Sequence, residues 1–312
     1  MQRKDKLKIL LPALPVLLAM ALFLAFPARY TESVREGVSL WAIAVLPATF
    51  PFLFLTALFT KLKLYRGFSR AVSPLAGRLF RVSGAGGCAA VLSALSGYPV
   101  GARTVYDLTR FGLLKKEEAF RVACLATTTG PMFLVGAVGA GMYNNAAAGW
   151  VLLVAHLAAV WLTCFFLRFT ANPAPLAPPD LPRERADIYE ILMQSVLSVL
   201  CVGGSIALFY AFGQMLSDIG NAAGITDVPM LEGVLRGLLE MTSGCSLLAK
   251  NFSPLSLALS CFLVTFGGAC VLMQQLVYLT RAGVKALPFL LVKFLQGVLA
   301  ALICFFLSSL VF

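Results

Sequence analysis

Charged residues are scarce in this chain of 312 residues, and their scarcity excludes most soluble protein classes. Only 12% of the residues are charged and 60% are hydrophobic, whereas a soluble domain normally carries about a quarter charged residues. Several apolar stretches approach or exceed the roughly 20 residues that a helix needs to cross a bilayer. These stretches are Ile9–Phe26, Val38–Thr60, Ala119–Met142, Trp150–Phe169, Ile191–Leu216, Ser256–Leu279 and Ala286–Phe312. The sequence therefore predicts an all-α polytopic membrane protein in a lipid bilayer.

Histidine is almost absent, and so are the short motifs of common enzymes. The single histidine, His156, has no obvious sequence partner, so we expect it to pack or to hydrogen-bond between helices. None of the eight cysteines forms a C-x-x-C pair, and no metal-ligand spacing accompanies His156. The chain also lacks an H-E-x-x-H helix, a nucleophile elbow and a phosphate-binding glycine loop. We therefore expect no enzyme, no metal and no cofactor.

Acidic residues are also few, with 14 against 25 Lys and Arg, which gives a net charge of +11. The basic residues cluster in short segments beside the apolar stretches, as the positive-inside rule describes, so nucleic acid is not an expected partner. Residues 61–83 carry six basic and no acidic residues, whereas residues 217–253 carry four acidic and two basic ones. This contrast places the two segments on opposite sides of the membrane. The basic N-terminus is predicted to be cytoplasmic and to precede a retained first span.

Prolines crowd one short segment, Asn172–Pro182, which cannot continue a helix and is typical of an extended connector. This segment divides the chain into two unequal halves. We expect an N-terminal span and outer loop over 1–36, a first repeat with a connecting span over 37–171, a linker over 172–186 and a second repeat over 187–312.

The two halves show a weak internal similarity. Tyr106–Leu113 aligns with Val277–Val284 at an offset of 171 residues, and the same offset places Ser96-Gly97 on Gly267-Gly268. Together with the opposite charge of corresponding segments, this predicts inverted-topology repeats, which build many secondary transporters. Each repeat is expected to contain one re-entrant helical hairpin, over residues 85–111 and 254–282. If either hairpin is a full span, the inversion fails.

A Ser-Pro pair precedes each glycine break. Ser73-Pro74 and Ser253-Pro254 each resemble a helix N-cap followed by proline at the first helical position. The two pairs stand at different distances from their breaks. We therefore expect two helix starts but draw no repeat register from them.

Residues 96–103 interrupt an apolar stretch with two glycines, a proline and then a cation. Gly and Pro release backbone hydrogen bonds, and in lipid such backbone is tolerated only where protein buries it or water reaches it. This pattern predicts a substrate-handling hairpin whose tip residues are Ser96, Gly97, Tyr98 and Pro99. Arg103 and Asp107 follow on one helical face. They either contact an anionic or polar solute or form an ion pair at the water interface.

A second interruption falls near the middle of the next apolar stretch. Its residues are Thr127, Thr128, Thr129, Gly130 and Pro131. Proline frees a carbonyl one turn earlier, and threonine hydroxyls can satisfy that carbonyl or face a cavity. Because hydroxyls, Gly and Pro coincide, we predict a broken helix that binds solute or a coupling ion. The alternative is a kink whose threonines bond back to their own helix.

In the second half, Glu240 is followed by two hydroxyl residues, Thr242 and Ser243, and by Gly244. A carboxylate beside hydroxyls suits a coupling ion, either H+ or Na+. The alternative is that Glu240 faces the water outside the membrane.

Three further residues complete the predicted solute site. Gly267 and Gly268 form the second glycine break, and Gln274 occupies the repeat position of Arg103. Lys293 lies seven residues from the start of the last stretch, where its long side chain can snorkel to the interface.

Three motifs carry a resemblance to a known family. They are Ser96-Gly97-Tyr98-Pro99-Val100-Gly101-Ala102, Thr129-Gly130-Pro131 leading into Phe133–Gly139, and Glu240-Met241-Thr242-Ser243-Gly244. In these motifs the chain resembles the YlbJ-type sporulation integral membrane proteins of the nucleoside-recognition or Gate-domain group, over most of its length from Val38. The resemblance implies an endospore-forming bacterium and a fold similar to concentrative nucleoside transporters. It also implies a role in moving dipicolinate from mother cell to forespore, and the bidentate fork of Arg103 suits a carboxylate.

The resulting hypothesis is an inner-membrane transporter of a small polar or anionic solute that works by alternating access. One alternative is a nucleoside-type transporter, for which an uncharged polar site suffices. Another is a non-transporting membrane protein that helps to assemble the spore envelope. The expected location is the bacterial cell membrane, including the outer forespore membrane during sporulation. Whether the chain forms a homo-oligomer is left open.

Overall fold

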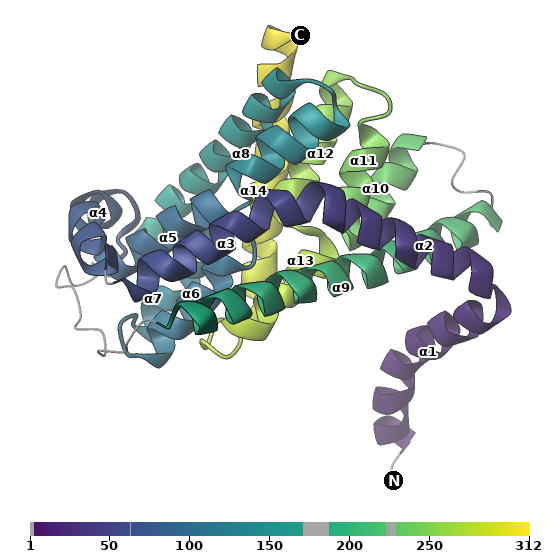
Figure 1. Ribbon diagram of the computed structural model, residues 1–312, viewed down its shortest axis with the longest axis horizontal. Coiled ribbons are helices and arrows are strands. Elements are labelled where there is room, and N and C mark those ends of the chain that lie inside the picture. The colour runs from purple at the N-terminus through teal and green to yellow at the C-terminus, as the bar shows by residue number, and fades with distance from the viewer. Residues whose placement is uncertain (1–2, 63, 171–186, 223, 225–228) are drawn as a thin grey trace.

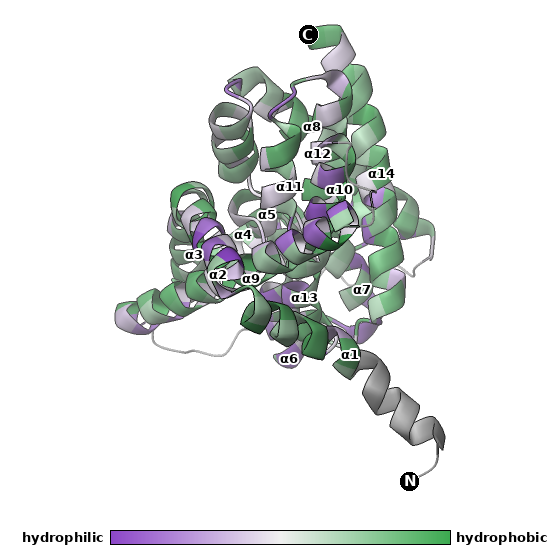
Figure 2. Ribbon diagram, turned by 90° about the vertical axis from the view of Figure 1, so that its right-hand side faces the viewer, coloured by the Kyte–Doolittle hydropathy of each residue, from purple (hydrophilic) through white to green (hydrophobic). Residues whose placement is uncertain are grey.

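The computed structural model describes residues 3–62, 64–170, 187–222, 224 and 229–312, and every regular element in these ranges is helical (Figure 1). The predicted linker over 172–186 lies outside the described residues. Five helices are long and apolar enough to cross a membrane, or six when one sharply bent pair is counted as a span. Hydrophobic residues predominate along α9 (Ile188–Ala222) and α14 (Ala286–Val311), whose ribbons are mostly green in Figure 2. These features are those of a multi-pass membrane protein.

Two long helices lie antiparallel across one side of the molecule (Figure 1). The first runs through α2 (Pro27–Leu40), the π-helical η1 (Trp41–Val45) and α3 (Leu46–Lys61), and the second is α9. They approach closely at Gly37, where an added Cβ would lie 2.8 Å from the Cα of Ala207. The outer loop expected before residue 37 is therefore helical, because Pro27 can start a helix and Tyr30 is buried. In Figure 1, α1 (Arg3–Ala25) projects away from this pair.

A sharp corner follows the first long helix. Residues 61–83, expected as a loop, contain α4 (Leu64–Phe80), which meets α5 (Gly84–Ser96) at 94°. The prediction that Ser73-Pro74 starts a helix is wrong, because Pro74 lies inside α4. The corresponding prediction for Ser253 is confirmed, since its side chain caps α12 (Pro254–Phe266) in a capping box.

The first glycine break is a turn between two helices. α5 ends at Ser96 and α6 (Val100–Arg110) begins after Gly97, Tyr98 and Pro99, which lie where the sequence predicts a hairpin tip. Gly97 has a φ of 78°, a left-handed conformation that favours glycine. The Tyr98–Pro99 peptide bond is cis.

The predicted break at the threonine run is present. α7 (Lys116–Leu125) ends before this run, and the π-helical η2 (Met132–Met142) begins after it. The chain then turns into α8 (Ala146–Leu167), which closes with the short 3₁₀-helix η3 (Arg168–Thr170). The first half of the chain therefore contains a helix pair, a broken helix and a long apolar helix, in that order.

The second half places its breaks differently from the prediction. A tight helix pair, α10 (Pro229–Leu239) and α11 (Met241–Leu248), turns at Glu240. α12 then continues through a break at Gly267 into α13 (Gly268–Leu279), and the two together form one membrane-length segment of 26 residues. Figures 1 and 2 both show α12 and α13 following one another rather than folding back. The hairpin expected over 254–282 is therefore wrong.

This arrangement also contradicts the register predicted for the repeat. The 171-residue offset pairs a turn between two helices, at Ser96-Gly97, with a break inside a continuing segment, at Gly267-Gly268. By order of elements, the turn at Gly97 corresponds instead to the turn at Glu240. The break after Leu125 then corresponds to the break at Gly267. The sequence similarity between the two halves indicated the wrong register because apolar helices of similar composition align in several registers.

Candidate solute site where the helix interruptions meet

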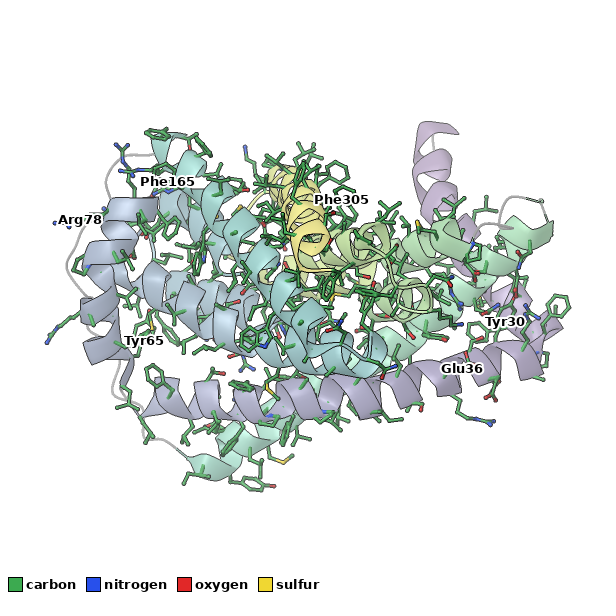
Figure 3. The ribbon with its side chains drawn as sticks, turned by 90° about the horizontal axis from the view of Figure 1, so that it is seen from above. Tyr30, Glu36, Tyr65, Arg78, Phe165 and Phe305 are labelled. Carbon is green, nitrogen blue, oxygen red and sulfur yellow. The ribbon has the colours of Figure 1, made fainter. Side chains whose placement is uncertain are left out.

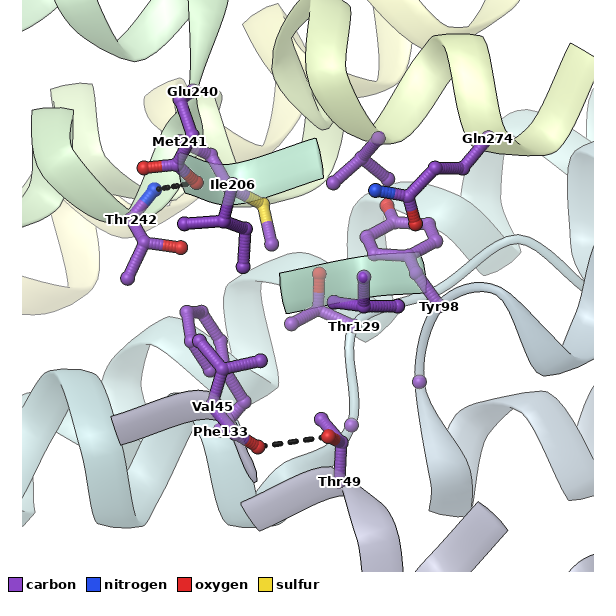
Figure 4. A pocket seen from close by; sticks show the side chains of 14 residues that line it. Val45, Thr49, Tyr98, Thr129, Phe133, Ile206, Glu240, Met241, Thr242 and Gln274 are labelled. Carbon is purple, nitrogen blue, oxygen red and sulfur yellow. Dashed lines mark hydrogen bonds between the residues drawn. The ribbon is translucent and has the colours of Figure 1, made fainter. Parts of the chain in front are cut away.

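A buried cavity of about 40 Å³ lies between the two halves of the chain (Figure 4). Both helix-pair turns, the threonine break, α13 and the two long helices contribute to its wall. The lining residues are Val45, Thr49, Gly97, Tyr98, Thr129, Gly130, Phe133, Val202, Ile206, Glu240, Met241, Thr242, Val271 and Gln274. In Figure 4, Gln274 lies beside Tyr98, and Glu240 lies across the cavity from both.

Two hydroxyl groups of the first half form hydrogen bonds with the C-terminal end of α12, where the helix is interrupted. The last carbonyls of a helix have no partner within the helix. Thr129 Oγ1 donates to the carbonyl oxygen of Val264 at 2.6 Å. The Tyr98 hydroxyl donates to the backbone carbonyl oxygen of Thr265 at 3.2 Å. These contacts satisfy carbonyls that the break at Gly267 releases. The interruptions of the two halves therefore stabilise each other.

His156 joins the same two interruptions from α8. Its Nε2 accepts a hydrogen bond from the backbone N–H of Thr129 at 3.0 Å, which leaves the proton of the neutral ring on Nδ1. Nδ1 lies 2.9 Å from Thr265 Oγ1 and donates to it in this tautomer. The ring is fully buried. The sequence-based expectation of hydrogen bonding between helices is confirmed.

Lys293 lies behind the cavity wall and is fully buried, which excludes the alternative that it snorkels to the interface. Its Nζ donates to the carbonyl oxygen of Thr127 at 2.8 Å and to the Tyr98 hydroxyl at 3.2 Å. The same nitrogen lies 5.5 Å from the centre of the Tyr98 ring. α14 thus holds both the hairpin tip and the threonine break through one side chain.

Glu240 begins α11 and is only 1% exposed, which excludes the alternative that it faces outside water. Its carboxylate accepts hydrogen bonds from the backbone N–H groups of Thr242 at 2.9 Å and Ser243 at 2.6 Å. It therefore caps a helix N-terminus, where the helix dipole stabilises negative charge. Glu240 also lines the cavity and is the one acidic side chain among the lining residues.

Seven of the predicted site residues line the cavity: Gly97, Tyr98, Thr129, Gly130, Glu240, Thr242 and Gln274. Nine do not: Ser96, Pro99, Arg103, Asp107, Thr127, Thr128, Ser243, Gly267 and Gly268. Four of these nine, Ser96, Pro99, Thr128 and Ser243, are adjacent in sequence to a lining residue. Thr127, Gly267 and Gly268 lie at the interruptions but not next to a lining residue. Arg103 and Asp107 lie farther along α6.

Arg103 faces α9 rather than the cavity. Its guanidinium donates to Gln194 Oε1 at 2.6 Å and to Ser198 Oγ at 3.3 Å, and its Nε lies 3.8 Å from Asp107 Oδ2. Both side chains are partly exposed. This geometry agrees with the alternative in which Arg103 and Asp107 form an ion pair near the surface of the protein.

The sequence analysis did not include Lys293 or the long helices in the site. A lysine amid apolar residues is a detectable signal, because a charge at membrane depth is costly and is retained at functional positions. Val45, Thr49, Val202 and Ile206 carry no such signal, since apolar and hydroxyl residues on a lipid-embedded helix are ordinary.

One relative with a curated description matches the chain. It is the sporulation integral membrane protein YlbJ of Bacillus subtilis (strain 168), 28% identical over 338 aligned positions that cover 95% of this chain and 82% of the relative. This match supports a YlbJ-type protein. This similarity agrees with the family indicated by the three motifs, and the matched region includes both halves of the cavity wall. No protein-family profile and no solved structure matches the chain.

Proposed function

We propose that this YlbJ-type protein transports a small polar or anionic solute by alternating access and is not an enzyme. One observation carries the proposal: the turns at Gly97 and Glu240 and the break at the threonine run line one cavity, and α13, which follows the break at Gly267, lines it as well. Non-helical backbone at membrane depth is tolerated where it is buried in protein or lines a cavity. Transporter binding sites are commonly built from such discontinuous helices at the interface of two repeats.

We also propose an inverted-repeat architecture similar to that of concentrative nucleoside transporters, with the corrected register. The shared order of elements supports it. Each half begins with a long helix and ends with a helix pair, a broken helix and a final long helix, and the first half has the additional helix α4 before its pair. The two turns, at Gly97 and Glu240, meet at the same cavity. Relative motion of these two helix pairs would open the cavity to one side of the membrane and then to the other.

The cavity of about 40 Å³ is far smaller than a drug-sized ligand site, which measures about 300–1,000 Å³. It therefore has room for a few water molecules but not for an aromatic dicarboxylate or a nucleoside. Solute binding requires the two helix-pair turns to move apart. The described conformation is accordingly a closed state of the proposed transport cycle.

For the solute we propose dipicolinate, on the basis of the family resemblance and of the sporulation role named for the YlbJ relative. The outer forespore membrane is the location that this solute implies. Tyr98 supplies an aromatic face, and Gln274 and Thr242 supply hydrogen-bonding groups in the cavity wall. Lys293, directly behind Tyr98, is the cation nearest to the hairpin tip.

The second candidate is a neutral, nucleoside-like solute. The chemistry of the wall favours it, because the lining residues include one carboxylate and no cation. A dianion entering this wall must be compensated by Lys293 or by a co-transported cation bound near Glu240. We propose Glu240 as the coupling group, with H+ or Na+ as the ion.

Uptake of labelled dipicolinate into proteoliposomes, with nucleosides as competitors, tests the proposal. We expect saturable uptake that depends on an H+ or Na+ gradient and loses that dependence in Glu240→Gln. Gln274→Ala removes one hydrogen-bonding amide from the solute site, which we expect to cost about 1–2 kcal/mol of binding free energy. The apparent affinity for the solute should fall about tenfold. Arg103→Ala is the matched control because Arg103 lies on the other face of the hairpin and contacts α9.

The result separates three functions. Competition by nucleosides but no uptake of dipicolinate favours the neutral-solute transporter. No transport of either solute class by folded protein, with and without ion gradients, contradicts the transporter proposal and favours a membrane assembly factor. Equal losses in Arg103→Ala and Gln274→Ala contradict the placement of the site at this cavity.

A further inference from the structure

Two buried ionisable groups of opposite type lie on opposite sides of the cavity. Glu240 and Lys293 are 1% and 0% exposed. Glu240 lines the cavity directly, whereas Lys293 reaches it through the cavity-lining Tyr98, whose hydroxyl lies 3.2 Å from Nζ. Figure 4 shows Glu240 across the cavity from Tyr98. Among the described residues, neither group forms an ion pair, although buried charges are normally paired.

The contacts of the Lys293 ammonium allow it to release a proton. The group carries three N–H donors. Two oxygens of the described residues accept from it, the carbonyl oxygen of Thr127 at 2.8 Å and the Tyr98 hydroxyl, and both are uncharged. A neutral amine keeps its contact with a phenol, because its lone pair accepts the O–H proton. Lysine also changes its protonation state readily when it is buried, so this position suits a proton-binding group.

The Tyr98 hydroxyl connects this lysine to the contact between the two halves of the chain. It accepts from Lys293 and donates to the carbonyl oxygen of Thr265, at the end of α12, at 3.2 Å. A phenol has one proton to donate. When Lys293 is a neutral amine, that proton turns to Nζ and the Thr265 carbonyl loses it. The protonation state of Lys293 therefore controls a hydrogen bond between the first helix pair and the broken segment of the second half.

The helices around Lys293 offer its proton few other acceptors. α14 packs against α7, α8, α12 and α13. The carboxylate that α7 buries, Glu118, accepts from the backbone N–H of Ser83 instead. The other titratable side chains that these four helices bury are thiols and one imidazole, which are not anions at neutral pH. They are Cys124 of α7, His156 and Cys164 of α8, Cys261 of α12 and Cys270 of α13.

The surroundings of Glu240 likewise contain no paired cation among the described residues. Arg236, one turn earlier on α10, forms an ion pair with Glu232. The other titratable groups that interact with Glu240 are two thiols and a phenol. They are Tyr210 of α9, Cys245 of α11 and Cys270 of α13. A proton arriving through the cavity is therefore a direct way to neutralise this carboxylate.

We propose that Lys293 is a proton-binding site of the transport cycle and exchanges its proton with Glu240, which makes H+ the coupling ion. The path runs from Nζ to the Tyr98 hydroxyl and through water in the cavity to the Glu240 carboxylate. The cavity of about 40 Å³ has room for such water. This inference rests on the proposed transport function, and it adds the identity of the ion and a second group that binds it.

The transfer balances within the protein. One N–H bond of the ammonium breaks as its proton moves to the Tyr98 oxygen. The phenol passes its own proton to a cavity water, and that water passes a proton to Glu240. The ammonium becomes a neutral amine and the carboxylate a neutral acid, so the net charge of the protein does not change. The amine then accepts from Tyr98, the contact with Thr265 is released, and Glu240 delivers the proton to the side to which the cavity opens.

The first test uses the full-length protein in proteoliposomes that contain a pH-sensitive dye, with labelled dipicolinate and labelled uridine as parallel probes. We expect a pH gradient, and not a Na+ gradient, to drive accumulation by the wild type. Exchange of labelled for unlabelled solute, without a gradient, is the reference for each variant. Relative to its own exchange, Lys293→Gln should lose at least half of the pH-driven accumulation and of the dye signal. Lys285→Gln is the matched control, because Lys285 is an exposed lysine at the start of the same helix.

Tyr98→Phe is a second variant, since it keeps the amine and removes the hydroxyl that relays the proton. It should show the same relative loss as Lys293→Gln. A folded Lys293→Gln that keeps the wild-type ratio of accumulation to exchange would overturn the proposal, as would a wild type driven by Na+ alone. A wild type that exchanges neither probe contradicts the proposed transport function instead, and proton binding at Lys293 is then decided by spectroscopy.

Ultraviolet resonance Raman spectroscopy of the protein in detergent needs no transport. The tyrosine doublet reports whether a hydroxyl accepts, donates or does both, and subtraction of the Tyr98→Phe spectrum isolates Tyr98. We expect the wild-type signal to change from accepting and donating to donating only, as the buffer goes from mildly acidic to alkaline. The signal of Lys293→Gln should stay constant. A wild-type signal that does not depend on pH would overturn the proposal, and so would the same change in Lys293→Gln.

Discussion

The Lys293 ammonium nitrogen lies 2.8 Å from the carbonyl oxygen of Thr127, so the last helix of the chain holds the break in the first broken helix. The same nitrogen reaches the hydroxyl of Tyr98 at the hairpin tip. One side chain thus positions two of the four interruptions. In a fully buried site this charge is contacted by a backbone carbonyl oxygen and a phenol oxygen, and both contacts hold the two interruptions in place.

Lys293→Met is expected to destabilise the protein by about 2–4 kcal/mol, because it leaves a buried carbonyl and a buried hydroxyl without their charged donor. Chemical unfolding in detergent measures this loss. Lys285→Met is the control, since Lys285 is exposed and should change stability by no more than about 0.5 kcal/mol. Equal effects of the two substitutions would show that Lys293 does not hold the interruptions together.

His156→Leu is expected to cost about 1–3 kcal/mol, because the backbone N–H of Thr129 and the Thr265 hydroxyl lose their shared partner. Thr163→Val on the same helix is the matched control. The Thr163 hydroxyl is buried too, but it bonds only to the carbonyl oxygen of Ala159 within α8. A loss in Thr163→Val as large as that in His156→Leu would contradict a role for His156 between the helices.

Gly101→Ala is expected to prevent normal packing of the first helix pair. A Cβ at this position would lie 1.5 Å from the carbonyl oxygen of Ala126, which is backbone and cannot yield. We expect a loss of about 3 kcal/mol or more, measured as a lower unfolding midpoint or a lower yield of folded protein. Gly136→Ala is the control, because no atom lies within 4 Å of its added Cβ. A fully stable Gly101→Ala would contradict the contact between α6 and the threonine break.

Glu240→Ala is expected to lower stability by about 1–2 kcal/mol through loss of a helix cap and to abolish ion-coupled uptake. Asn145→Ala is a matched control, because Asn145 Oδ1 caps α8 by accepting hydrogen bonds from two backbone N–H groups, and Asn145 does not line the cavity. It should lose comparable stability and retain uptake. If uptake falls equally in both variants, capping rather than the carboxylate at the cavity explains the effect of Glu240.

The local breaks of this fold were predictable because Gly, Pro and hydroxyl residues change the backbone directly. The turn at Gly97, the break after Leu125 and the cap at Ser253 all follow from such residues. The polytopic helical character follows from composition alone. These predictions depend on short-range chemistry, which a single sequence records.

The pairing of distant elements could not be predicted in the same way. Arg103 was predicted at the solute site from its distance to the glycine break, but its helical face is turned toward α9. For Lys293 the sequence allowed snorkelling to the interface, because its depth in the last helix is moderate, yet α14 packs against the threonine break there. In both cases the rotation of a helix about its axis decides the outcome, and nearly uniform apolar helices do not reveal that rotation.

The two long helices are also longer than a bilayer is thick. At about 1.5 Å per residue, the 33 residues of Pro27–Phe59 and the 35 residues of α9 each extend for about 50 Å, against a hydrocarbon layer of about 30 Å. Such helices must tilt steeply or reach beyond the acyl chains. Because Val45, Thr49, Val202 and Ile206 on these helices line the cavity, any change of tilt alters the cavity wall. The thickness of the surrounding membrane therefore influences the shape of the cavity.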